Sequence, residues 1–366
     1  MIEFAGVTKQ YPDGTVAVDN LDLAVPEGNL VVFVGPSGCG KTTSMRMINR
    51  MIEPTSGTLT VNGEDVTKVD AVKLRLGIGY VIQSAGLMPH QRVVDNVATV
   101  PVLKGESRRA ARKSALGVLE RVGLDPKLAD RYPAQLSGGQ QQRVGVARAL
   151  AADPPILLMD EPFSAVDPVV REELQAEILR LQSELHKTIV FVTHDIDEAI
   201  KIGDKVAVFG LGGVLQQYDE PKRLLSNPAN DFVAGFIGAD RGYRGLQFRH
   251  ATGLRIHDIR AVSEAGIDAI ELRAGEWALV TKPNGAPYAW IDGAGVDLHR
   301  SGKPLYDSTT AGGSLFRPED SLRQALDAAL SSPSGLGVAV DTDGKPIGGV
   351  LADDVIDALK KQRSAQ

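Results

Sequence analysis

The stretch Gly35-Pro36-Ser37-Gly38-Cys39-Gly40-Lys41-Thr42 decides the fold of the first domain of this 366-residue chain. It fits the pattern G-x-x-x-x-G-K-[ST] at every required position. The apolar run Val31–Val34 precedes it, and a helical pattern follows from about Lys41 to Met51. A Gly-rich turn between a strand and a helix binds phosphate, because its backbone N–H groups and the helix dipole attract an anion. The stretch therefore predicts a nucleotide-binding α/β domain.

Two side chains of this loop have separate expected roles. The Lys41 ammonium would reach the β- and γ-phosphates of a nucleotide, and the Thr42 hydroxyl would bind Mg²⁺. Cys39 lies inside the loop, and we expect its backbone rather than its thiol to face the phosphates. The cofactors predicted from the motif are ATP and Mg²⁺.

A second group of reactive side chains stands at the end of another strand. The apolar run Ile156–Met159 is followed directly by Asp160 and Glu161. A carboxylate at a strand end can hold Mg²⁺ through its water shell, which is the role expected of Asp160. Glu161 could polarise the attacking water as a general base. Because many strands end in carboxylates, this pair alone is weak evidence for a catalytic site. It becomes strong evidence because a phosphate-binding loop stands earlier in the chain.

A third motif, Leu136-Ser137-Gly138-Gly139-Gln140, precedes the helical run 141–152 and makes a second helix start suited to an anion. The chain thus has two helix starts suited to an anion, one after the phosphate-binding loop and one after this motif. Together they make residues 1 to about 240 resemble the ATP-binding subunits of ABC transporters. In that family the motif faces the phosphate-binding loop of the other subunit, and two ATP molecules lie between two domains. The resemblance implies a homodimer with these contacts to ATP in trans: Ser137, Gly138, Gly139 and Gln140.

Further positions match this family one at a time. Gln83 resembles the glutamine that touches Mg²⁺ and couples to a transmembrane partner, and His194 resembles the switch histidine at the γ-phosphate. Asp167, in Ser164-Ala165-Val166-Asp167, resembles the loop that communicates across the dimer. Tyr11 resembles the aromatic residue that stacks on adenine, although the turn Pro12–Thr15 could demand an aromatic for packing alone. The resemblance implies three catalytic residues (Glu161, His194, Gln83), three Mg²⁺ ligands (Thr42, Gln83, Asp160) and these ATP contacts within one subunit: Tyr11, Gly35, Pro36, Ser37, Gly38, Cys39, Gly40, Lys41, Thr42 and Thr43.

Composition and charge exclude several other classes. The formal net charge of −6 argues against a protein that binds nucleic acid by neutralising phosphates. Cys39 is the single cysteine, so a disulfide scaffold is excluded and a cytosolic location fits. No apolar run approaches the roughly 18–20 residues of a membrane helix. The first residues lack the basic and apolar regions of a secretion signal.

The order of strands and helices divides the chain into domains. Residues 1–240 alternate strand-like and helix-like segments, which predicts an α/β fold with a mainly parallel core sheet. Met1–Tyr11 and Thr15–Val25 predict an antiparallel β edge section, and residues 86–150 predict a helical subdomain. Residues 241–252 are expected to form a linker to the tail.

The tail, residues 253–362, is predicted to be a smaller α+β unit in which strand–turn–strand patterns are followed by helices. It resembles a tandem CBS module, with a degenerate first repeat at about 253–305 and a second at about 306–362. CBS modules that bind adenine nucleotides usually place Ser or Thr after the last strand, where this chain has Leu351-Ala352. Some relatives respond to ionic strength or to a cyclic dinucleotide. The alternative is that the tail only assists dimerisation.

Three short segments suggest which transporter branch this is. Ile48–Gly57, Leu87–Gln91 and Phe236–Arg241 resemble the osmoprotectant importers, which take up glycine betaine, choline, carnitine or proline betaine. A stand-alone cassette implies two separate transmembrane permease subunits, an extracytoplasmic substrate-binding protein and a peripheral place on the cytoplasmic face of the cell membrane. The alternatives are a soluble CBS-regulated ATPase without a permease and an importer ATPase for another small solute, such as an amino acid.

Two surfaces are expected to contact partners. Residues 84–100 should dock the permease, with Leu87, Met88 and Val93 as apolar contacts, unless these side chains belong to the local core. Five arginines between residues 241 and 260 suit anionic lipid headgroups, which attract each basic residue by about 1 kcal/mol. The alternative is a solvated linker whose arginines pair with acidic residues such as Asp258.

Overall fold

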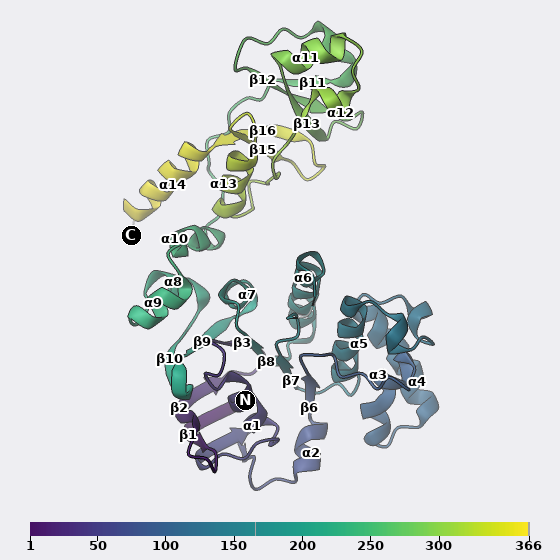
Figure 1. Ribbon diagram of the computed structural model, residues 1–366, viewed down its shortest axis with the longest axis vertical. Coiled ribbons are helices and arrows are strands. Elements are labelled where there is room, and N and C mark those ends of the chain that lie inside the picture. The colour runs from purple at the N-terminus through teal and green to yellow at the C-terminus, as the bar shows by residue number, and fades with distance from the viewer. Residues whose placement is uncertain (165, 365–366) are drawn as a thin grey trace. The chain divides into compact units, whose positions relative to one another are not determined.

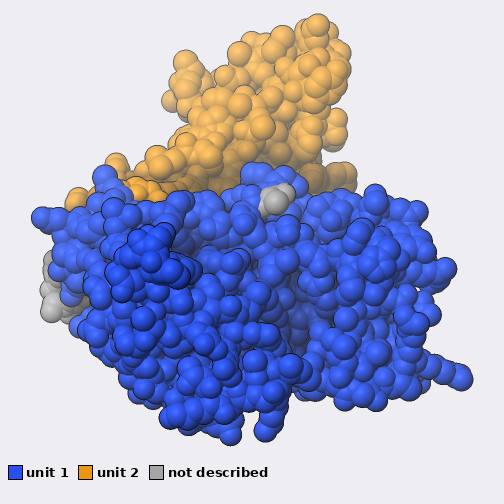
Figure 2. Space-filling view, turned by 60° about the horizontal axis from the view of Figure 1, so that its bottom comes forward, with its two compact units in different colours: residues 1–239 blue, residues 240–366 orange. Residues whose placement is uncertain are grey.

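A computed structural model of the protein describes residues 1–164 and 166–364, so Ala165 of the expected dimer-communication motif lies outside the described residues. The chain forms two compact units, Met1–Ala239 and Asp240–Gln366 (Figures 1 and 2). The first unit carries every residue of the expected nucleotide site. The second unit is the tail. Each unit has hydrophobic core clusters of its own.

The first unit is built on a six-stranded sheet that positions the phosphate-binding loop. The strand order is β10-β9-β3-β8-β7-β6, and all pairs are parallel except β10 with β9. All residues of the central strands are buried, as expected of a parallel sheet covered on both faces. The predicted parallel core sheet is confirmed. Its strands are β3 (Leu30–Val34), β6 (Ile78–Val81), β7 (Ile156–Asp160), β8 (Thr188–Thr193), β9 (Lys205–Phe209) and β10 (Leu215–Asp219).

The beginning of the chain forms a separate antiparallel sheet of order β2-β1-β4-β5, as predicted for the β edge section. Phe4 and Leu21 of this sheet share one hydrophobic cluster with Met45 of the first helix and Leu158 of the core sheet. The two sheets therefore enclose the helix that follows the phosphate-binding loop. The strands are β1 (Ile2–Gln10), β2 (Val16–Val25), β4 (Ser56–Val61) and β5 (Glu64–Asp65), and the helix is α1 (Lys41–Ile48).

Three helices gather into the predicted helical subdomain, in which α3 packs on both α4 and α5 (Figure 1). Ser107 caps α4 by accepting a hydrogen bond from the N–H of Ala110, which satisfies one of the free donors of the first turn. Val93 is fully buried here, so the expectation that it faces a partner was wrong. Leu87 and Met88 are half-buried. The helices are α3 (Val93–Leu103), α4 (Arg108–Arg121) and α5 (Gly138–Leu150).

The remaining helices of the first unit connect or follow strands of the core sheet. The longest of them is α6, and Asp167 caps it by accepting from the N–H of Val170. The short helix α2 precedes β6 and contacts it. These elements are α2 (Ala71–Leu76), α6 (Pro168–Leu185), α7 (Ile196–Ile202), α8 (Pro221–Ser226), α9 (Asp231–Ile237) and the 3₁₀ turns η1 (Pro126–Leu128), η2 (Pro133–Gln135) and η3 (Leu211–Gly213).

The segment 241–252 is folded and is not a linker. It forms α10 (Arg241–Arg244) and the 3₁₀ turn η4 (Gly245–Phe248), and it buries Leu246 and Ala251 in the tail core. Two of its backbone groups bond across to residues 320 and 322. The expectation of a linker failed because two isolated apolar positions give a weak periodic signal within an arginine-rich stretch.

Two of the five arginines between residues 241 and 260 are engaged by neighbouring groups. Arg244 forms an ion pair with Asp240 at 3.2 Å, and its side chain is only 12% exposed. Arg260 donates to the carbonyl of Glu271 at 2.8 Å. These two side chains therefore pair with groups of the protein, which was the expected alternative to a contact with lipid headgroups.

The tail contains two hairpins built to the same plan. In the first, Thr281 faces Pro287 across the turn, and in the second, Val340 faces Pro346, with a register irregularity at the same place in both. A helix follows each hairpin directly. The elements are β12 (Trp277–Thr281), β13 (Pro287–Asp292) and α11 (Gly293–Arg300) in the first, and β15 (Leu336–Val340), β16 (Pro346–Leu351) and α14 (Ala352–Ser364) in the second.

Two crossing segments interlock these hairpins. One pairs His257 with Gly349 of the second hairpin and then runs as β11 (Ala261–Ser263) beside the first. The other pairs as β14 (Thr310–Ala311) with the first hairpin and then places Phe316 beside Ala339 of the second. Leu279, Trp290, Val338 and Val340 form one cluster between the hairpins. Shorter elements are η5 (Glu264–Ala269), α12 (Leu305–Ser308) and α13 (Leu322–Ser331).

Candidate functional site

The phosphate-binding loop needs glycine at positions that no other residue fits. Gly40 has φ of 89°, and a Cβ there would lie 2.1 Å from the carbonyl oxygen of Ala17. At Gly35 a Cβ would lie 2.3 Å from the carbonyl oxygen of Phe209. Both are far inside van der Waals contact, so the loop is closed tightly by backbone on two sides.

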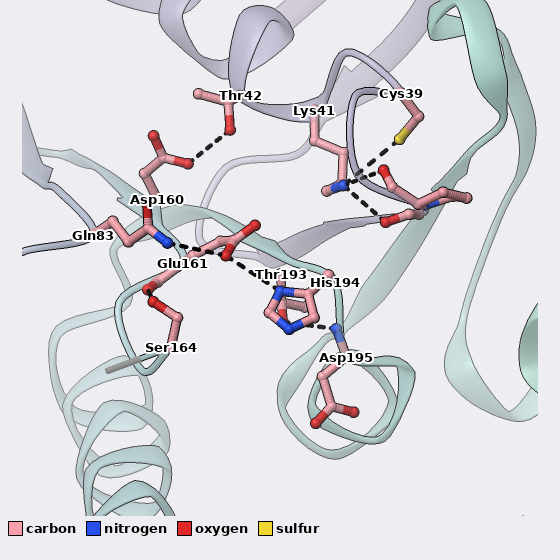
Figure 3. Close-up of polar contacts among 12 residues, drawn as sticks. Cys39, Lys41, Thr42, Gln83, Asp160, Glu161, Ser164, Thr193, His194 and Asp195 are labelled. Atoms are coloured by element: carbon pink, nitrogen blue, oxygen red, sulfur yellow. Dashed lines mark hydrogen bonds and ion pairs between the residues drawn. The ribbon is translucent and has the colours of Figure 1, made fainter. Parts of the chain in front are cut away.

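Lys41 occupies the centre of this loop. Its ammonium donates to the carbonyl oxygens of Gly35 and Pro36, both at 2.8 Å, and the Sγ of Cys39 lies 3.6 Å away (Figure 3). Burial raises the pKa of the Cys39 thiol, so that thiol stays protonated at neutral pH. The Cys39 side chain packs into the core cluster, and its backbone remains in the loop.

A hydroxyl and a carboxylate meet beside the loop. Thr42 Oγ1 donates to Asp160 Oδ1 at 2.9 Å, although the two residues come from α1 and β7 (Figure 3). Asp160 is only 5% exposed. Its other oxygen, Oδ2, lies 3.4 Å from Arg46 Nη2 and 3.4 Å from the Tyr80 hydroxyl. Burial raises the pKa of Tyr80, so its hydroxyl remains a donor at neutral pH.

Two of the residues expected to be catalytic, His194 and Gln83, contact the carboxylate of the third, Glu161. Glu161 Oε2 lies 3.2 Å from His194 Nδ1 and 3.4 Å from Gln83 Nε2. Figure 3 shows Glu161 between these two side chains, next to the Thr42–Asp160 pair. Gln83 follows β6, Glu161 follows β7 and His194 follows β8, so three neighbouring strands deliver them to the same edge of the sheet.

The backbone at Glu161 is strained in a way that aims its side chain. Its φ is 43°, in the left-handed region that a residue with a Cβ rarely adopts. The N–H of Glu161 donates to the carbonyl oxygen of Val192 on the neighbouring strand, and the Ser164 hydroxyl donates to the carbonyl of Glu161. Both bonds fix the turn. Such strain is concentrated at functional sites.

The Ser-Gly-Gly motif lies at the start of α5, on the exposed surface of the helical subdomain. Ser137 and Gln140 form a capping box, in which each side chain bonds the backbone N–H of the other. Ser137 and Gly138 are exposed, and Gly139 is half-exposed. A Cβ at Gly139 would lie 2.5 Å from a methyl group of Val170, so the motif packs on the helix that Asp167 caps.

The remaining expected ATP contacts line the mouth of the loop or lie near it. Ser37 and Gly38 are exposed, and Thr43 is half-buried in the first turn of α1. Tyr11 is half-buried before β2, and the Lys9 ammonium lies 5.3 Å from the centre of its ring. The carbonyl of Ala17 on β2 adjoins Gly40, which brings this strand to the loop.

The oxygen donors at Thr42 and Asp160 suit Mg²⁺, a hard cation that is usually held by one or two carboxylates together with phosphate oxygens. Within the described residues there is no group of three or more His, Cys, Asp or Glu side chains that could hold a metal ion alone. This donor set therefore fits a metal that is bound jointly with a nucleotide.

Sequence reasoning missed three side chains that organise the site. Arg46 and Tyr80 contact Asp160, and Arg148 donates to the carbonyls of Ala85 and Gly86 just after Gln83. Arg148 could have been found, because it is a charged residue within the buried face of α5. Arg46 and Tyr80 gave no signal, since each follows its element's ordinary pattern.

An apolar pocket of about 290 Å³ adjoins the site. Its walls come from α2, β6, α3 and α5, and they include Val72, Tyr80, Leu103 and Ala149. Leu103 is 68% exposed and Val72 is 63% exposed, which is unusual for large apolar side chains. Exposed apolar surface of this kind marks contact sites for other molecules.

Comparisons with known proteins give the same picture. The family model described as ABC transporter matches residues 18–164. The osmoprotectant import ATP-binding protein OsmV of Salmonella typhimurium is 41% identical over 378 residues, spanning 100% of this chain and 97% of the relative. The choline transport ATP-binding protein OpuBA of Bacillus subtilis is 39% identical, over 98% of this chain and 96% of the relative. The carnitine transport ATP-binding protein OpuCA of Listeria monocytogenes is 52% identical over 66% of this chain, which spans 60% of that relative's length.

Solved structures resemble the first unit. An ATP-binding cassette solved as a dimer in a post-hydrolysis state, bound to ADP and Pi, is 35% identical with a TM-score of 0.56 and covers 60% of this chain and 99% of its own. The cbiO1 protein of Clostridium perfringens is 28% identical, with a TM-score of 0.58 and coverage of 62% and 91%. Among the described residues, no helix has the length and apolar character to cross a membrane.

Proposed function

Since the chain belongs to the ATP-binding proteins of ABC transporters, we propose that it is the ATP-hydrolysing subunit of an importer for quaternary-amine osmoprotectants. The observation that carries the proposal is the meeting of Lys41, the Thr42–Asp160 pair and the Gln83–Glu161–His194 cluster at one sheet edge. The solute class is supported by relatives that span nearly the whole chain and whose names give osmoprotectant import and choline transport.

The side chains of the site divide the work of hydrolysis. Lys41 binds the β- and γ-phosphates of ATP, and the loop backbone cradles them. Thr42, Asp160 and Gln83 would hold Mg²⁺, which when bound neutralises phosphate charge. Glu161 accepts the proton of the attacking water, and His194 contacts the γ-phosphate while it orients Glu161 through their 3.2 Å contact. Tyr11 stacks on the adenine ring.

The complete site requires two copies of the chain. Ser137, Gly138, Gly139 and Gln140 contact the ATP of the other copy, and Asp167 transmits between the two sites. Two features support this arrangement. The Ser-Gly-Gly motif is exposed at a helix start, where backbone N–H groups favour an anion. The similar cassette with ADP and Pi was solved as a dimer.

The apolar pocket between α2, β6, α3 and α5 is the docking site that we assign to a permease subunit. Leu103 and Val72 at its rim would be covered by an apolar segment of the partner. Two permease subunits hold the ATPase dimer at the cytoplasmic face of the cell membrane, and an extracytoplasmic substrate-binding protein acts through them. In this arrangement the solute never touches the ATPase.

The tail is proposed to be a regulatory tandem CBS module. Its two hairpins of equal register and the two crossing segments support an internal duplication. Ala352 stands where a nucleotide-binding CBS repeat would offer a hydroxyl, which disfavours ATP or AMP as the ligand. Ionic strength and a cyclic dinucleotide are the two candidate signals for the tail. The engaged side chains of Arg244 and Arg260 do not favour a contact with anionic lipid.

Solute uptake tests this proposal directly. The gene would be deleted, and uptake of labelled glycine betaine, choline, carnitine and proline would be measured under osmotic stress, with the intact gene and a Lys41→Ala gene returned. We expect uptake of at least one quaternary amine to return only with the intact gene. Uptake of an amino acid alone would establish the alternative importer, and no change in any uptake would favour an ATPase without a permease.

A further inference from the structure

Tyr80 belongs to two features that lie side by side. Tyr80 is one of the residues that line the apolar pocket between α2, β6, α3 and α5. Its hydroxyl reaches Asp160 Oδ2 at 3.4 Å. Tyr80 pairs in register with Leu158 on the neighbouring strand, two residues before Asp160, so all three side chains are on the same face of the sheet. Tyr80 therefore belongs both to the pocket lining and to the surroundings of the carboxylate.

The two oxygens of Asp160 are held by different partners. Oδ1 accepts from the Thr42 hydroxyl, whereas Oδ2 faces Tyr80 and Arg46. Asp160 is almost wholly buried, so these contacts determine the plane of the carboxylate. Among the atoms of the Tyr80 side chain, only the hydroxyl contacts Asp160. The ring packs against the hydrophobic cluster, as a phenylalanine ring would.

We propose that Tyr80 and Arg46 are positioning residues for the metal-binding carboxylate, and that Tyr80 transmits occupation of the apolar pocket to that carboxylate. Holding Oδ2 orients Oδ1, which accepts from the Thr42 hydroxyl, so that both oxygens are placed to face the metal together. A partner that enters the pocket presses on the Tyr80 ring and thereby shifts its hydroxyl against Asp160. This route is separate from the one through Gln83, which contacts Glu161 instead. The proposal rests on the function proposed above for the pocket and the site.

The first experiment measures metal affinity rather than hydrolysis. Full-length protein saturated with ADP is titrated with Mn²⁺, and free Mn²⁺ is followed by electron paramagnetic resonance. Tyr80→Phe should weaken Mn²⁺ binding about two- to tenfold, the effect of losing one hydrogen bond, while metal-free ADP affinity stays unchanged. Tyr218→Phe is the matched control, because its hydroxyl bonds the carbonyl of Ala24, away from Asp160. Unchanged Mn²⁺ affinity in Tyr80→Phe would overturn the positioning role.

Arg46→Gln provides a second test that does not depend on Tyr80. It removes the cation 3.4 Å from Oδ2 but leaves Thr42 in place. Mn²⁺ affinity should again fall while thermal unfolding shows a folded protein. If Tyr80→Phe fails to fold, this variant alone decides: a normal Mn²⁺ affinity in folded Arg46→Gln contradicts the proposal.

The second experiment fills the pocket. Leu103→Cys introduces a thiol at the rim, and Val102→Cys introduces an exposed thiol next to it that does not line the pocket. The native Cys39 is buried. After labelling with a bulky maleimide, Leu103→Cys should change Mn²⁺ affinity at least twofold and Val102→Cys should not. In the Tyr80→Phe background the Leu103→Cys effect should disappear.

An equal shift with and without the Tyr80 hydroxyl, or no shift at all, would refute transmission through Tyr80. Failure of the proposed function is distinguishable, because it would appear as unchanged solute uptake in the deletion strain or as absent ATP hydrolysis in the wild-type protein. Mn²⁺ affinity is measured independently of that result.

Discussion

At the scale of single residues, Glu161 shows how a strained backbone serves a site. Its left-handed φ turns the chain directly after a buried strand, and the carboxylate points toward His194 and Gln83 instead of into the core. The strain is offset by the bond from its N–H to the neighbouring strand. Asp160, one residue earlier, remains in regular strand conformation and faces α1. The two adjacent carboxylates therefore face different groups: Asp160 faces Thr42, and Glu161 faces His194 and Gln83.

Replacing Glu161 by Gln should separate binding from hydrolysis. The amide keeps the shape of the side chain but cannot accept a proton, so hydrolysis should slow by about 10²–10⁴-fold. ATP affinity, measured by titration, should stay near the wild-type value. Lys41→Ala is the contrasting variant, in which ATP affinity itself falls. Wild-type turnover in Glu161→Gln would show that another group acts as the base.

The buried carboxyl of Glu198 leads to a prediction about how the free energy of unfolding depends on pH. It is buried on α7 and accepts a hydrogen bond from Gln175 at 3.0 Å, and burial raises its pKa. A carboxyl with a raised pKa binds its proton more tightly in the folded protein, so the free energy of unfolding falls as pH rises through the window above the ordinary value of 4.5.

Glu198→Gln should remove this pH dependence while its carbonyl oxygen still accepts from Gln175. Chemical unfolding monitored by circular dichroism should show the variant more stable than the wild type at pH 8. The difference should vanish below pH 4, where Glu198 is protonated in both states. A variant that is less stable at pH 8 would mean that the ionised carboxylate stabilises the fold.

At the scale of elements, the helix starts of α1 and α5 carry two halves of one proposed site. The first opens with the phosphate-binding loop, and the second is closed by the Ser137–Gln140 capping box. Each is positioned by a different layer: α1 between the two sheets and α5 in the helical subdomain. The capping box holds the Ser137 side chain in place before any nucleotide arrives.

Mixing two defective chains should test whether these starts meet between subunits. In a heterodimer of Ser137→Arg and Lys41→Ala chains, both defects fall on one of the two sites and the other keeps all its direct contacts. ATP-dependent dimerisation, measured by light scattering, should return in the mixture although neither chain alone shows it. If verified mixtures never recover, the two helix starts do not share a site in trans.

At the scale of the whole molecule, the sequence predicted the first unit far better than the second. Motifs such as Gly35–Thr42 are local, so their residues could be read in order. Gln83, Glu161 and His194 were each matched to a family position, and the structure brings the three into contact. Arg46 and Tyr80 could not be predicted, since their meeting at Asp160 depends on how α1 crosses the sheet. In the tail, Leu246 and Ala251 join a core made mostly by residues far along the chain.

The crossing segments of the tail have a consequence for cutting the chain. Residues 301–304, between α11 and α12, are exposed, and a protease site inserted there would divide the tail between its hairpins. After cleavage, β13 and His257 belong to the first fragment, and their partners β14 and Gly349 belong to the second. Both pairings therefore still connect the two fragments. We therefore expect the two pieces to co-elute on gel filtration and, when expressed separately, to complement each other. Fragments that separate without denaturant would show that each hairpin is self-sufficient.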